Sequence, residues 1–317
     1  MKNNIIEVRN LVKKYKKATQ NAVDGVSFDV KEGEFFTLLG PNGAGKTTTI
    51  SVLNTTLSKT AGSVKVDGLE IEENADQVRR KIGVIFQNQS LDQNLTAEEN
   101  VRFHAVLYGL YSYYPLFSMM PKAYRDKVEE LSEVLGIGKE IHNPIKTFSG
   151  GMKRKLEIVK GLVHRPKLLF LDEPTTGLDP LSRKNLWQYL SEVRKKGELT
   201  LFLTTHYLEE AEGSDRICII DEGKVVSLGT PNEIKKDLVD DYLEVETQDK
   251  ESLRKELQKM KLSFEEHESF KIRLKNNQVQ GVLSDLKTKI TNIKLHTPTL
   301  EEAYLEIINN EPKNENV

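Results

Sequence analysis

Short apolar runs alternate with helical stretches along the first two thirds of the chain. Val26, Phe28 and Val30 alternate with polar residues, a period of two that predicts a strand with one buried face. Later runs are almost continuously apolar, which is typical of parallel strands covered on both faces. They occupy residues 35–39, 168–171, 201–203 and 217–220. Because helical stretches such as residues 124–135 lie between these runs, the pattern predicts a layered α/β domain.

The pattern changes near Gly229, where the chain becomes charge-rich and its fully apolar runs end. From there it predicts a strand at 242–247, a helix at 251–260, strands at 264–268 and 270–274, a helix at 279–287 and a strand at 290–296. That order is typical of a small ferredoxin-like α+β domain. A final helix is predicted to begin with Thr299 as its cap and Glu302 reaching back, and the polar tail 311–317 is expected to fray.

Length and composition agree with two domains in a reducing compartment. The 317 residues fit two domains at roughly 150 residues each, which we place at 1–230 and 231–310. The net charge of −2 gives no general attraction to nucleic acid or anionic lipid. Cys218 is the only cysteine, which excludes an intrachain disulfide or a multi-cysteine metal site and fits a cytoplasmic setting. No apolar run approaches the roughly 20 residues of a membrane span, so a membrane function would need a second chain.

A glycine-rich segment follows the apolar run at 35–39 and precedes a helical run at 47–53. It consists of Gly40, Pro41, Asn42, Gly43, Ala44, Gly45, Lys46 and Thr47, which fits the pattern G-x-x-x-x-G-K-[ST]. Glycines let backbone N–H groups turn toward phosphate oxygens, and the following helix adds the positive end of its dipole. We therefore expect Lys46 to contact the β- and γ-phosphates of a nucleotide and Thr47 to ligate Mg²⁺.

Two carboxylates, Asp172 and Glu173, end the apolar run at 168–171. At a strand end beside a phosphate loop, Asp172 is expected to hold Mg²⁺ through its water shell. Alternation along a strand predicts that Glu173 points to the opposite face, where it can meet an attacking water. Two adjacent acidic residues more often form a charged strand end without function. The glycine-rich segment in the same chain nevertheless favours a nucleotide site here.

Further motifs resemble those of the ATP-binding-cassette family. One run resembles the family signature: Phe148-Ser149-Gly150-Gly151-Met152. Leu and Gln usually stand at its two ends. Residues 176–179 resemble the D-loop, Gln87 matches the Q-loop, His206 matches the switch histidine, and Tyr15 matches the aromatic residue that stacks on adenine. The resemblance implies a P-loop NTPase core, over residues 5–230, with a helical subdomain at about 88–160.

In that family two cassettes meet head to tail, and each ATP lies between the phosphate loop of one and the signature of the other. The single set of motifs in this chain therefore implies a homodimer. The resemblance assigns phosphate and Mg²⁺ contacts to Lys46, Thr47, Thr48, Gln87 and Asp172. It makes Glu173 the catalytic base and His206 the γ-phosphate contact. The residues expected at the dimer seam are Ser149, Gly150, Gly151 and Asp179.

Residues 204–212 and 297–304 narrow the resemblance to the daunorubicin-resistance type of ATPase subunit. Such subunits energise exporters whose membrane subunit is separately encoded, which implies efflux of a drug, antibiotic or lipid-like substrate, with the chain attached to the inner face of the membrane. One alternative is a soluble ATPase acting on nucleic acid or ribosomes, although such relatives usually carry two cassettes or a long coiled-coil insertion. Another is a regulatory module without turnover, which the presence of Glu173 and His206 argues against.

The uncharged stretch at 110–121 is rich in Tyr, Phe and Met. Two interpretations remain open. The stretch folds back on the helical subdomain, or it forms a docking surface for the membrane subunit, because these residue types are common at interfaces. Histidines other than His206 have no ligand-like neighbours and are expected to be structural or exposed.

Overall fold

A computed structural model describes residues 3–86, 90–197, 199–238, 242–273, 279–296 and 299–310. The chain divides into two compact units, residues 1–228 and 229–317, which are described separately. The division lies two residues from the boundary placed at 230 from the sequence. The first unit contains two sheets and the second contains one.

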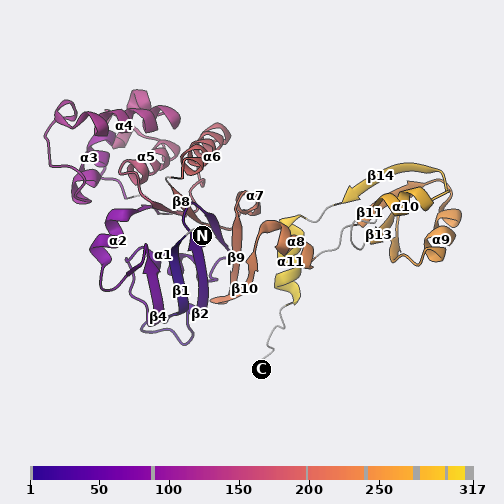
Figure 1. Ribbon diagram of the computed structural model, residues 1–317. Helices are drawn as coiled ribbons and strands as arrows, with labels where there is room; N and C mark the ends of the chain where they lie inside the picture. Colours follow the sequence, from indigo (N-terminus) through magenta and orange to yellow (C-terminus); the bar gives the residue numbers. More distant parts are fainter. Residues whose placement is uncertain are drawn as a thin grey trace. The chain divides into compact units, whose positions relative to one another are not determined.

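The central sheet of the first unit has six strands in the order β10-β9-β3-β8-β7-β6 (Figure 1). The strands are β3 (Phe35–Leu39), β6 (Ile82–Ile85), β7 (Leu168–Asp172), β8 (Thr200–Thr205), β9 (Arg216–Asp221) and β10 (Lys224–Gly229). The pairs β3–β8, β3–β9, β6–β7 and β7–β8 are parallel. Every residue of β3, β7 and β8 is buried, as their apolar runs predict, because helices and a second sheet cover them. The predicted α/β class is confirmed.

An antiparallel sheet in the order β2-β1-β4-β5 completes the first unit's strands. Its strands are β1 (Asn4–Lys13), β2 (Val23–Lys31), β4 (Ala61–Val66) and β5 (Leu69–Glu70). Buried residues alternate along β2 as the sequence predicts. The ring centroid of Phe28 in β2 lies 5.2 Å from that of Phe36 in β3, and Phe36 lies 5.4 Å from Phe202 in β8. These aromatic contacts join the two sheets.

The helices of the first unit lie between these strands in the chain. They are α1 (Lys46–Leu53), α2 (Ala75–Lys81), α3 (Ala97–Leu107), α4 (Lys122–Val134), α5 (Gly150–Leu162), α6 (Pro180–Lys195) and α7 (Leu208–Glu212). Short 3₁₀ turns occupy Phe117–Met119, Gly138–Glu140 and Ile145–Thr147. Figure 1 shows α3, α4 and α5 grouped beside α6. Tyr124, Val128 and Leu131 bury one face of α4, with the helical spacing that a packed amphipathic helix requires.

The uncharged stretch at 110–121 divides between the two interpretations. Leu110, Tyr111 and Phe117 pack against the buried core of the first unit, and Met120 is only 2% exposed. In contrast, Tyr113 is 55%, Leu116 58% and Met119 55% exposed. The stretch therefore folds back on its own helices through one set of side chains and presents the other set to the surface.

The second unit contains a four-stranded antiparallel sheet in the order β12-β13-β11-β14. Its strands are β11 (Tyr242–Thr247), β12 (Phe264–Glu266), β13 (Phe270–Arg273) and β14 (Ile290–His296). Its helices are α8 (Pro231–Leu238), α9 (Lys250–Lys259), α10 (Val279–Asp285) and α11 (Leu300–Asn310). The order of β11 to β14 with α9 and α10 is the ferredoxin-like order that the pattern predicts. A core of apolar residues including Leu243, Leu253 and Phe270 fills the space between sheet and helices.

The first turn of α11 has the predicted cap. The backbone N–H of Glu302 donates to Oγ1 of Thr299 at 3.2 Å, and the backbone N–H of Thr299 donates to Oε2 of Glu302 at 3.0 Å. This reciprocal pair satisfies two backbone donors at the start of the helix. The predicted tail at 311–317 lies outside the described residues. None of the helices in the described ranges is both long and apolar enough to cross a bilayer.

Candidate functional site

The glycine-rich segment connects β3 to α1 at the carboxyl edge of the parallel sheet. Lys46, the first residue of α1, is buried, and its Nζ donates to the carbonyls of Gly40 at 2.7 Å and Pro41 at 2.8 Å. Burial lowers the pKa of Lys46, and the nearby Glu173 and Asp172 charges oppose that effect. The segment thus wraps around its own cation, while Thr47 lies exposed at the start of the helix.

Two glycines are required by close approaches of neighbouring backbone. A Cβ built on Gly40 would lie 2.2 Å from the carbonyl oxygen of Ile220, and one on Gly45 would lie 2.4 Å from that of Ala22. Gly45 also has a φ of 101°, a conformation that L side chains rarely adopt. The tight turn that a phosphate cradle needs is therefore built into the packing of this segment.

Asp172 ends β7 with its carboxylate buried. Thr204 in the neighbouring strand β8 donates its hydroxyl to Oδ1 of Asp172. Burial raises the pKa of Asp172, and the Thr204 hydrogen bond, Lys46 and Arg154 counteract that effect. The carboxylate therefore sits among donors and cations at the strand end near Lys46 of the phosphate loop, a position that fits the predicted Mg²⁺ contact.

Glu173 does not continue the strand, so the alternation argument for its direction is wrong. β7 ends at Asp172, and Glu173 has a φ of 48°. Its backbone N–H donates to the carbonyl of Thr204 at 3.0 Å. Nδ1 of His206, which follows β8, lies 2.7 Å from Oε1 of Glu173. The turn and the neighbouring strand, rather than strand pleating, set the direction of this carboxylate.

Tyr15 lies beside the phosphate loop, as an adenine-stacking residue should. Its ring is about half exposed, and its hydroxyl lies 3.2 Å from Oγ1 of Thr48. Nζ of Lys13 lies 5.7 Å from the centre of the ring. The exposed face of the ring is therefore available next to the segment that would hold the phosphates.

The signature run forms the start of α5 and lies against residues 176–179. Ser149 caps the helix by accepting from the backbone N–H of Met152 at 3.2 Å, and both Ser149 and Gly150 are exposed. A Cβ built on Gly151 would lie 3.1 Å from the carbonyl oxygen of Gly177. Asp179 caps α6 through the backbone N–H of Ser182 at 2.9 Å. Hydrogen bonds from Ser182 lower the pKa of Asp179.

Comparisons with known proteins place this geometry in a family. A family profile described as ABC transporter matches residues 23–176. The doxorubicin resistance ATP-binding protein DrrA of Mycobacterium tuberculosis is 35% identical over 315 residues, which cover 95% of this chain and 92% of that protein. The daunorubicin/doxorubicin resistance ATP-binding protein DrrA of Streptomyces peucetius is 41% identical over 248 residues, covering 78% and 72%. The chain belongs to the ABC transporter family. Its cassette is an ATP hydrolase, and the predicted resemblance to the daunorubicin-resistance type is confirmed.

Other relatives set the extent of the match. The probable multidrug ABC transporter ATP-binding protein YbhF of Escherichia coli is 38% identical over 237 residues, and the chain spans 39% of its length. Among solved structures, an ATP-binding subunit of an ABC transporter has a TM-score of 0.66 and 31% identity, covering 74% of this chain and 92% of that one. A dimeric post-hydrolysis cassette bound to ADP and Pi has a TM-score of 0.64 and 26% identity, covering 71% and 98%.

The donor set of this ABC cassette fits ATP with Mg²⁺. In the described ranges, no three His, Cys, Asp or Glu side chains form a group that could hold a metal ion. Mg²⁺ does not need one at a nucleotide site, because it binds through one or two carboxylates, substrate phosphates and water. The exposed hydroxyl of Thr47 and the carboxylate of Asp172 supply such a set. Gln87, the other expected ligand, lies outside the described residues.

Three residues that organise the ABC site were missed from the sequence. Thr204 orients Asp172, and Glu210 accepts from Oγ1 of Thr205 at 2.8 Å and also from Thr175. Arg154, which follows the signature run, is buried and donates to the backbone carbonyls of Asp172 and Glu173. Thr204 and Glu210 lie in the run 204–212 that carries the family resemblance, but most of the contacts join residues far apart in the chain, so that run does not reveal them.

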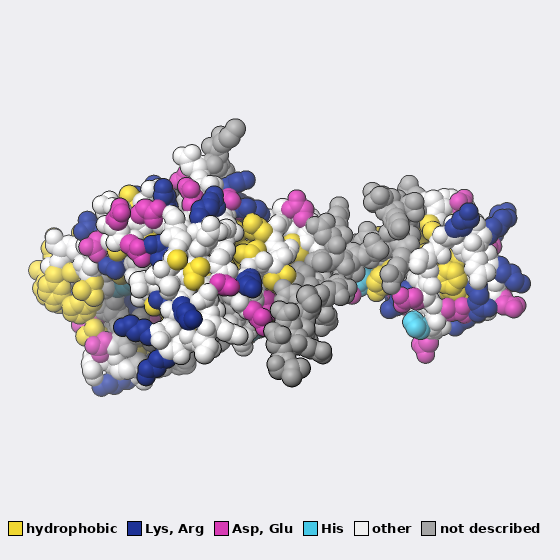
Figure 2. Space-filling model, turned by 90° about the horizontal axis from the view of Figure 1, so that it is seen from below, with side chains coloured by type: hydrophobic (Ala, Val, Ile, Leu, Met, Phe, Trp, Pro, Cys, Tyr) yellow, Lys and Arg dark blue, Asp and Glu magenta, His cyan; other side chains and the backbone are white. Residues whose placement is uncertain are grey.

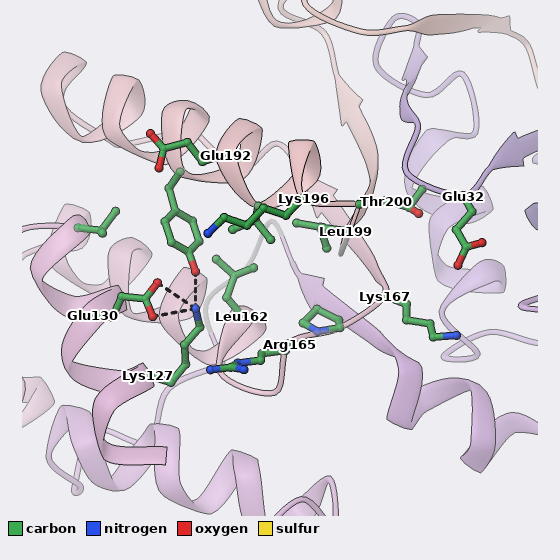
Figure 3. Close-up of a pocket in the computed structure, with 15 residues that line it drawn as sticks. Glu32, Lys127, Glu130, Leu162, Arg165, Lys167, Glu192, Lys196, Leu199 and Thr200 are labelled. Atoms are coloured by element: carbon green, nitrogen blue, oxygen red, sulfur yellow. Dashed lines mark hydrogen bonds and ion pairs between the residues drawn. The ribbon is translucent and has the colours of Figure 1, made fainter. Parts of the chain in front are cut away.

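A separate cavity of about 740 Å³ lies at the opposite edge of the sheet (Figure 3). Residues of α4, α6 and the segments that precede β7 and β8 line it, whereas the ATP site lies where these strands end. Lys127 donates to the hydroxyl of Tyr189 at 2.6 Å and to Glu130 at 3.1 Å (Figure 3). Because lining cations and carboxylates nearly balance, the cavity gives no strong selection for an anion. It is not part of the nucleotide site.

Proposed function

We propose that this chain is the ATP-hydrolysing subunit of an exporter. Two copies pair head to tail around two ATP and drive efflux of a drug, antibiotic or lipid-like substrate through a separately encoded membrane subunit, at the inner face of the membrane. The observation that carries the proposal is the 2.7 Å contact between Glu173 and His206 beside Asp172 and Lys46. A base, its partner, a metal-binding carboxylate and a phosphate-binding cation meet at one sheet edge.

The phosphate loop and its neighbours bind the nucleotide. Backbone N–H groups of residues 40–45, except Pro41, which has none, hold the phosphates together with the ammonium of Lys46 and with Thr48, and Tyr15 stacks on adenine. Mg²⁺ held there would neutralise the negative charge of the phosphates. Thr47, Asp172 and Gln87 are the residues proposed to hold it. The burial of Lys46 strengthens its attraction to phosphate, because a low dielectric weakens screening.

The hydrolytic step falls to Glu173 and His206. The carboxylate of Glu173 orients a water and takes its proton as the water oxygen attacks the γ-phosphorus and the bond to ADP breaks. His206 fixes the carboxylate through Nδ1 and contacts the γ-phosphate, whose developing charge it stabilises. Catalysis in this arrangement consists of positioning and charge stabilisation.

Two observations support the head-to-tail pair. Ser149 and Gly150 are exposed at the beginning of the 13-residue helix α5, where N–H groups and the helix dipole favour a phosphate from another copy. A solved neighbour at 26% identity is a dimeric cassette bound to ADP and Pi. In the proposed dimer Gly151 joins Ser149 at the second nucleotide, and Asp179 lies at the seam.

Relatives and an exposed apolar surface support the export role. Relatives include the linearmycin resistance ATP-binding protein LnrL of Bacillus subtilis, 38% identical over 231 residues and covering 73% of this chain and 70% of that protein. The apolar patch is the exposed set Leu107, Tyr113, Leu116 and Met119, with Phe103 stacked on Tyr113 at 5.9 Å. Figure 2 shows apolar side chains gathered at the end of the first unit that carries α3 and α4. We assign this patch to contact with the membrane subunit, because such patches on soluble surfaces are typical of binding sites.

The test is a variant that binds ATP without hydrolysing it. Glu173→Gln keeps the side chain's shape but cannot take a proton, so turnover should fall by about 10²–10⁴. The protein should then elute as a dimer with Mg-ATP, while the wild type, which hydrolyses the bridging ATP, elutes as a monomer. Glu222→Gln, at an exposed carboxylate, is the control and should behave as wild type. Wild-type turnover by Glu173→Gln would refute the role of Glu173, and an inactive monomer would refute the sandwich dimer of this chain alone.

A further inference from the structure

We infer that Arg154 is a positioning residue that ties the backbone around Glu173 to α5, the helix that carries the signature. The inference rests on the proposed function, because it concerns how the hydrolytic carboxylate is held in place. It goes further in assigning a role to a residue outside the phosphate, metal and catalytic contacts.

The guanidinium of Arg154 binds four backbone carbonyls from two segments. Nη2 donates to the carbonyls of Glu173 at 2.7 Å and Asp172 at 3.1 Å, and Nε donates to that of Pro174 at 3.0 Å. Nη1 donates to the carbonyl of Phe86, the residue that directly follows β6. One side chain on α5 therefore holds three successive peptide groups of the turn after β7 and the residue that follows β6.

Burying the charge of Arg154 costs free energy, so its position needs an explanation. Arg154 is 3% exposed, and the described ion pairs do not include it, so its charge is met by carbonyl dipoles and by the fields of Glu157, Asp172 and Glu173. Burying a cation is expensive even with full hydrogen bonding. A buried apolar residue could fill the same volume, but it could not bind the carbonyls of the turn.

The conformation of Glu173 explains what the contacts accomplish. Its φ of 48° lies in the left-handed region, which non-glycine residues enter only when the surroundings hold them there. Thr204 accepts from its backbone N–H at 3.0 Å, and Arg154 donates to its carbonyl at 2.7 Å. Because the peptide groups on both sides of its Cα are held, the direction of its Cα–Cβ bond is set, and from that position the carboxylate meets His206.

A second set of contacts on α5 points to the same role. Glu157, one turn further along, accepts from the backbone N–H of Ser90 at 2.7 Å. Lys160 donates to the carbonyl of Ser90 at 3.1 Å and pairs with Glu157 at 3.0 Å. The buried face of α5 thus holds Ser90 as well as Phe86 and the turn at 172–174. If α5 moved, the hydrogen bonds of Arg154 would therefore move the backbone of Glu173 with it.

Lysine cannot replace arginine here. A guanidinium presents five N–H donors in a planar fork, whereas an ammonium is a single centre that cannot reach carbonyls on both sides of the turn. Arg154→Lys keeps the charge but loses most of this geometry, and Arg154→Gln is a milder variant that keeps two donors without the charge. Arg102→Lys is the matched control: Arg102 is 4% exposed, pairs with Glu98 at 3.0 Å and donates to the carbonyl of Tyr114 at 2.6 Å, away from the nucleotide site.

The experiment measures ATP affinity, kcat, KM and Tm for the full chain and these variants. Arg154→Lys should lower kcat by about 10²-fold, because small displacements of a catalytic group carry a loss of that size. Its Kd and KM for ATP should stay within about threefold of wild type, since it does not touch the phosphate loop. Arg102→Lys should lower Tm while leaving kcat near wild type at temperatures well below that Tm.

The possible results separate the inference from the proposed function. A wild-type kcat in Arg154→Lys, beside an inactive Glu173→Gln, overturns the inference alone. The same holds if loss of folded protein accounts for the whole effect, or if both Arg154 variants are insoluble while Arg102→Lys is soluble, since the role would then be structural. A wild-type protein that hydrolyses no ATP overturns the proposed function and this inference together.

Discussion

Nδ1 of His206 lies 2.7 Å from Oε1 of Glu173, although 33 residues separate them in the chain. Register in the central sheet brings them together: Asp172 of β7 pairs with Thr204 of β8, so the residues that follow each strand emerge side by side. The parallel arrangement of the two strands is what allows their carboxyl ends to share one edge. The proposed hydrolytic pair is therefore brought together by strand pairing rather than by a local motif.

Substitutions of His206 should separate its two contacts. An Asn side chain places its amide nitrogen near the position of Nδ1, whereas a Gln side chain reaches toward that of Nε2. Because the structure joins Nδ1 to Glu173, we expect His206→Asn to retain more ATPase activity than His206→Gln, and His206→Ala to lose about 10²-fold. Steady-state phosphate release measures all three. Higher activity in the Gln variant would mean that the phosphate contact, rather than the hold on Glu173, dominates.

Replacement of Lys46 should lower the affinity for ATP more than it lowers the stability of the fold. Each hydrogen bond to a charged group contributes about 1.5–3 kcal/mol, so Lys46→Ala should raise the Kd for ATP by about 10- to 100-fold. The two carbonyls that Lys46 now binds, those of Gly40 and Pro41, would become available to water. Titration with a fluorescent ATP analogue gives the affinity. Lys16→Ala, which removes an equal charge from an exposed position, should bind like wild type, and equal affinity in both variants would contradict the assignment.

The apolar patch and the packed residues beside it should respond differently. Replacing Tyr113, Leu116 and Met119 with Ser changes only exposed side chains. The thermal stability and ATPase activity of the isolated chain should therefore be unchanged. Co-purification with the coexpressed membrane subunit should fall about tenfold or more, since each buried side chain contributes about 1.5–3 kcal/mol at an interface. Phe117→Ser should instead lower Tm, because Phe117 packs against the core. Leu295→Ser, an exposed change in the second unit, is the neutral control, and undiminished co-purification of the triple variant would contradict the docking role.

A buried histidine should make stability fall in acid. Burial, with the nearby Lys160 and His164 charges, lowers the pKa of His104 to about 3 from an ordinary value of 6.5. Below about pH 6.5 the unfolded chain takes up a proton that the folded chain refuses, so stability is lost as pH falls from there toward 3. His104→Phe removes the group that takes up this proton. The Tm of the variant should therefore fall less than that of wild type between pH 7 and pH 5. An equal fall of Tm between pH 7 and pH 5 in wild type and His104→Phe would contradict this prediction.

The sequence by itself determined the features whose information is local. The phosphate loop could be predicted because its eight residues are contiguous and its function depends on their backbone. Apolar runs identified β3, β7 and β8, since a parallel strand covered on both faces is composed mainly of apolar side chains. The cap of α11 was predicted from Thr299 and Glu302, because both partners lie within one helical turn. The order of strands and helices in the second unit likewise followed from periodicity.

Only the tertiary structure decided which distant residues meet and which face each side chain presents. Alternation gave the wrong reason for the direction of Glu173, because the strand ends before it and the contacts of Thr204 and Arg154 fix its turn. Arg154 stands between two other cations in the sequence, Lys153 and Lys155, yet packing of α5 buries it against the turn at 172–174. Residues 110–121 offered two interpretations that composition could not separate, because exposure depends on what packs against each side chain. Strand register and helix packing act between residues far apart in the chain, and a pattern read along the chain does not contain those distances.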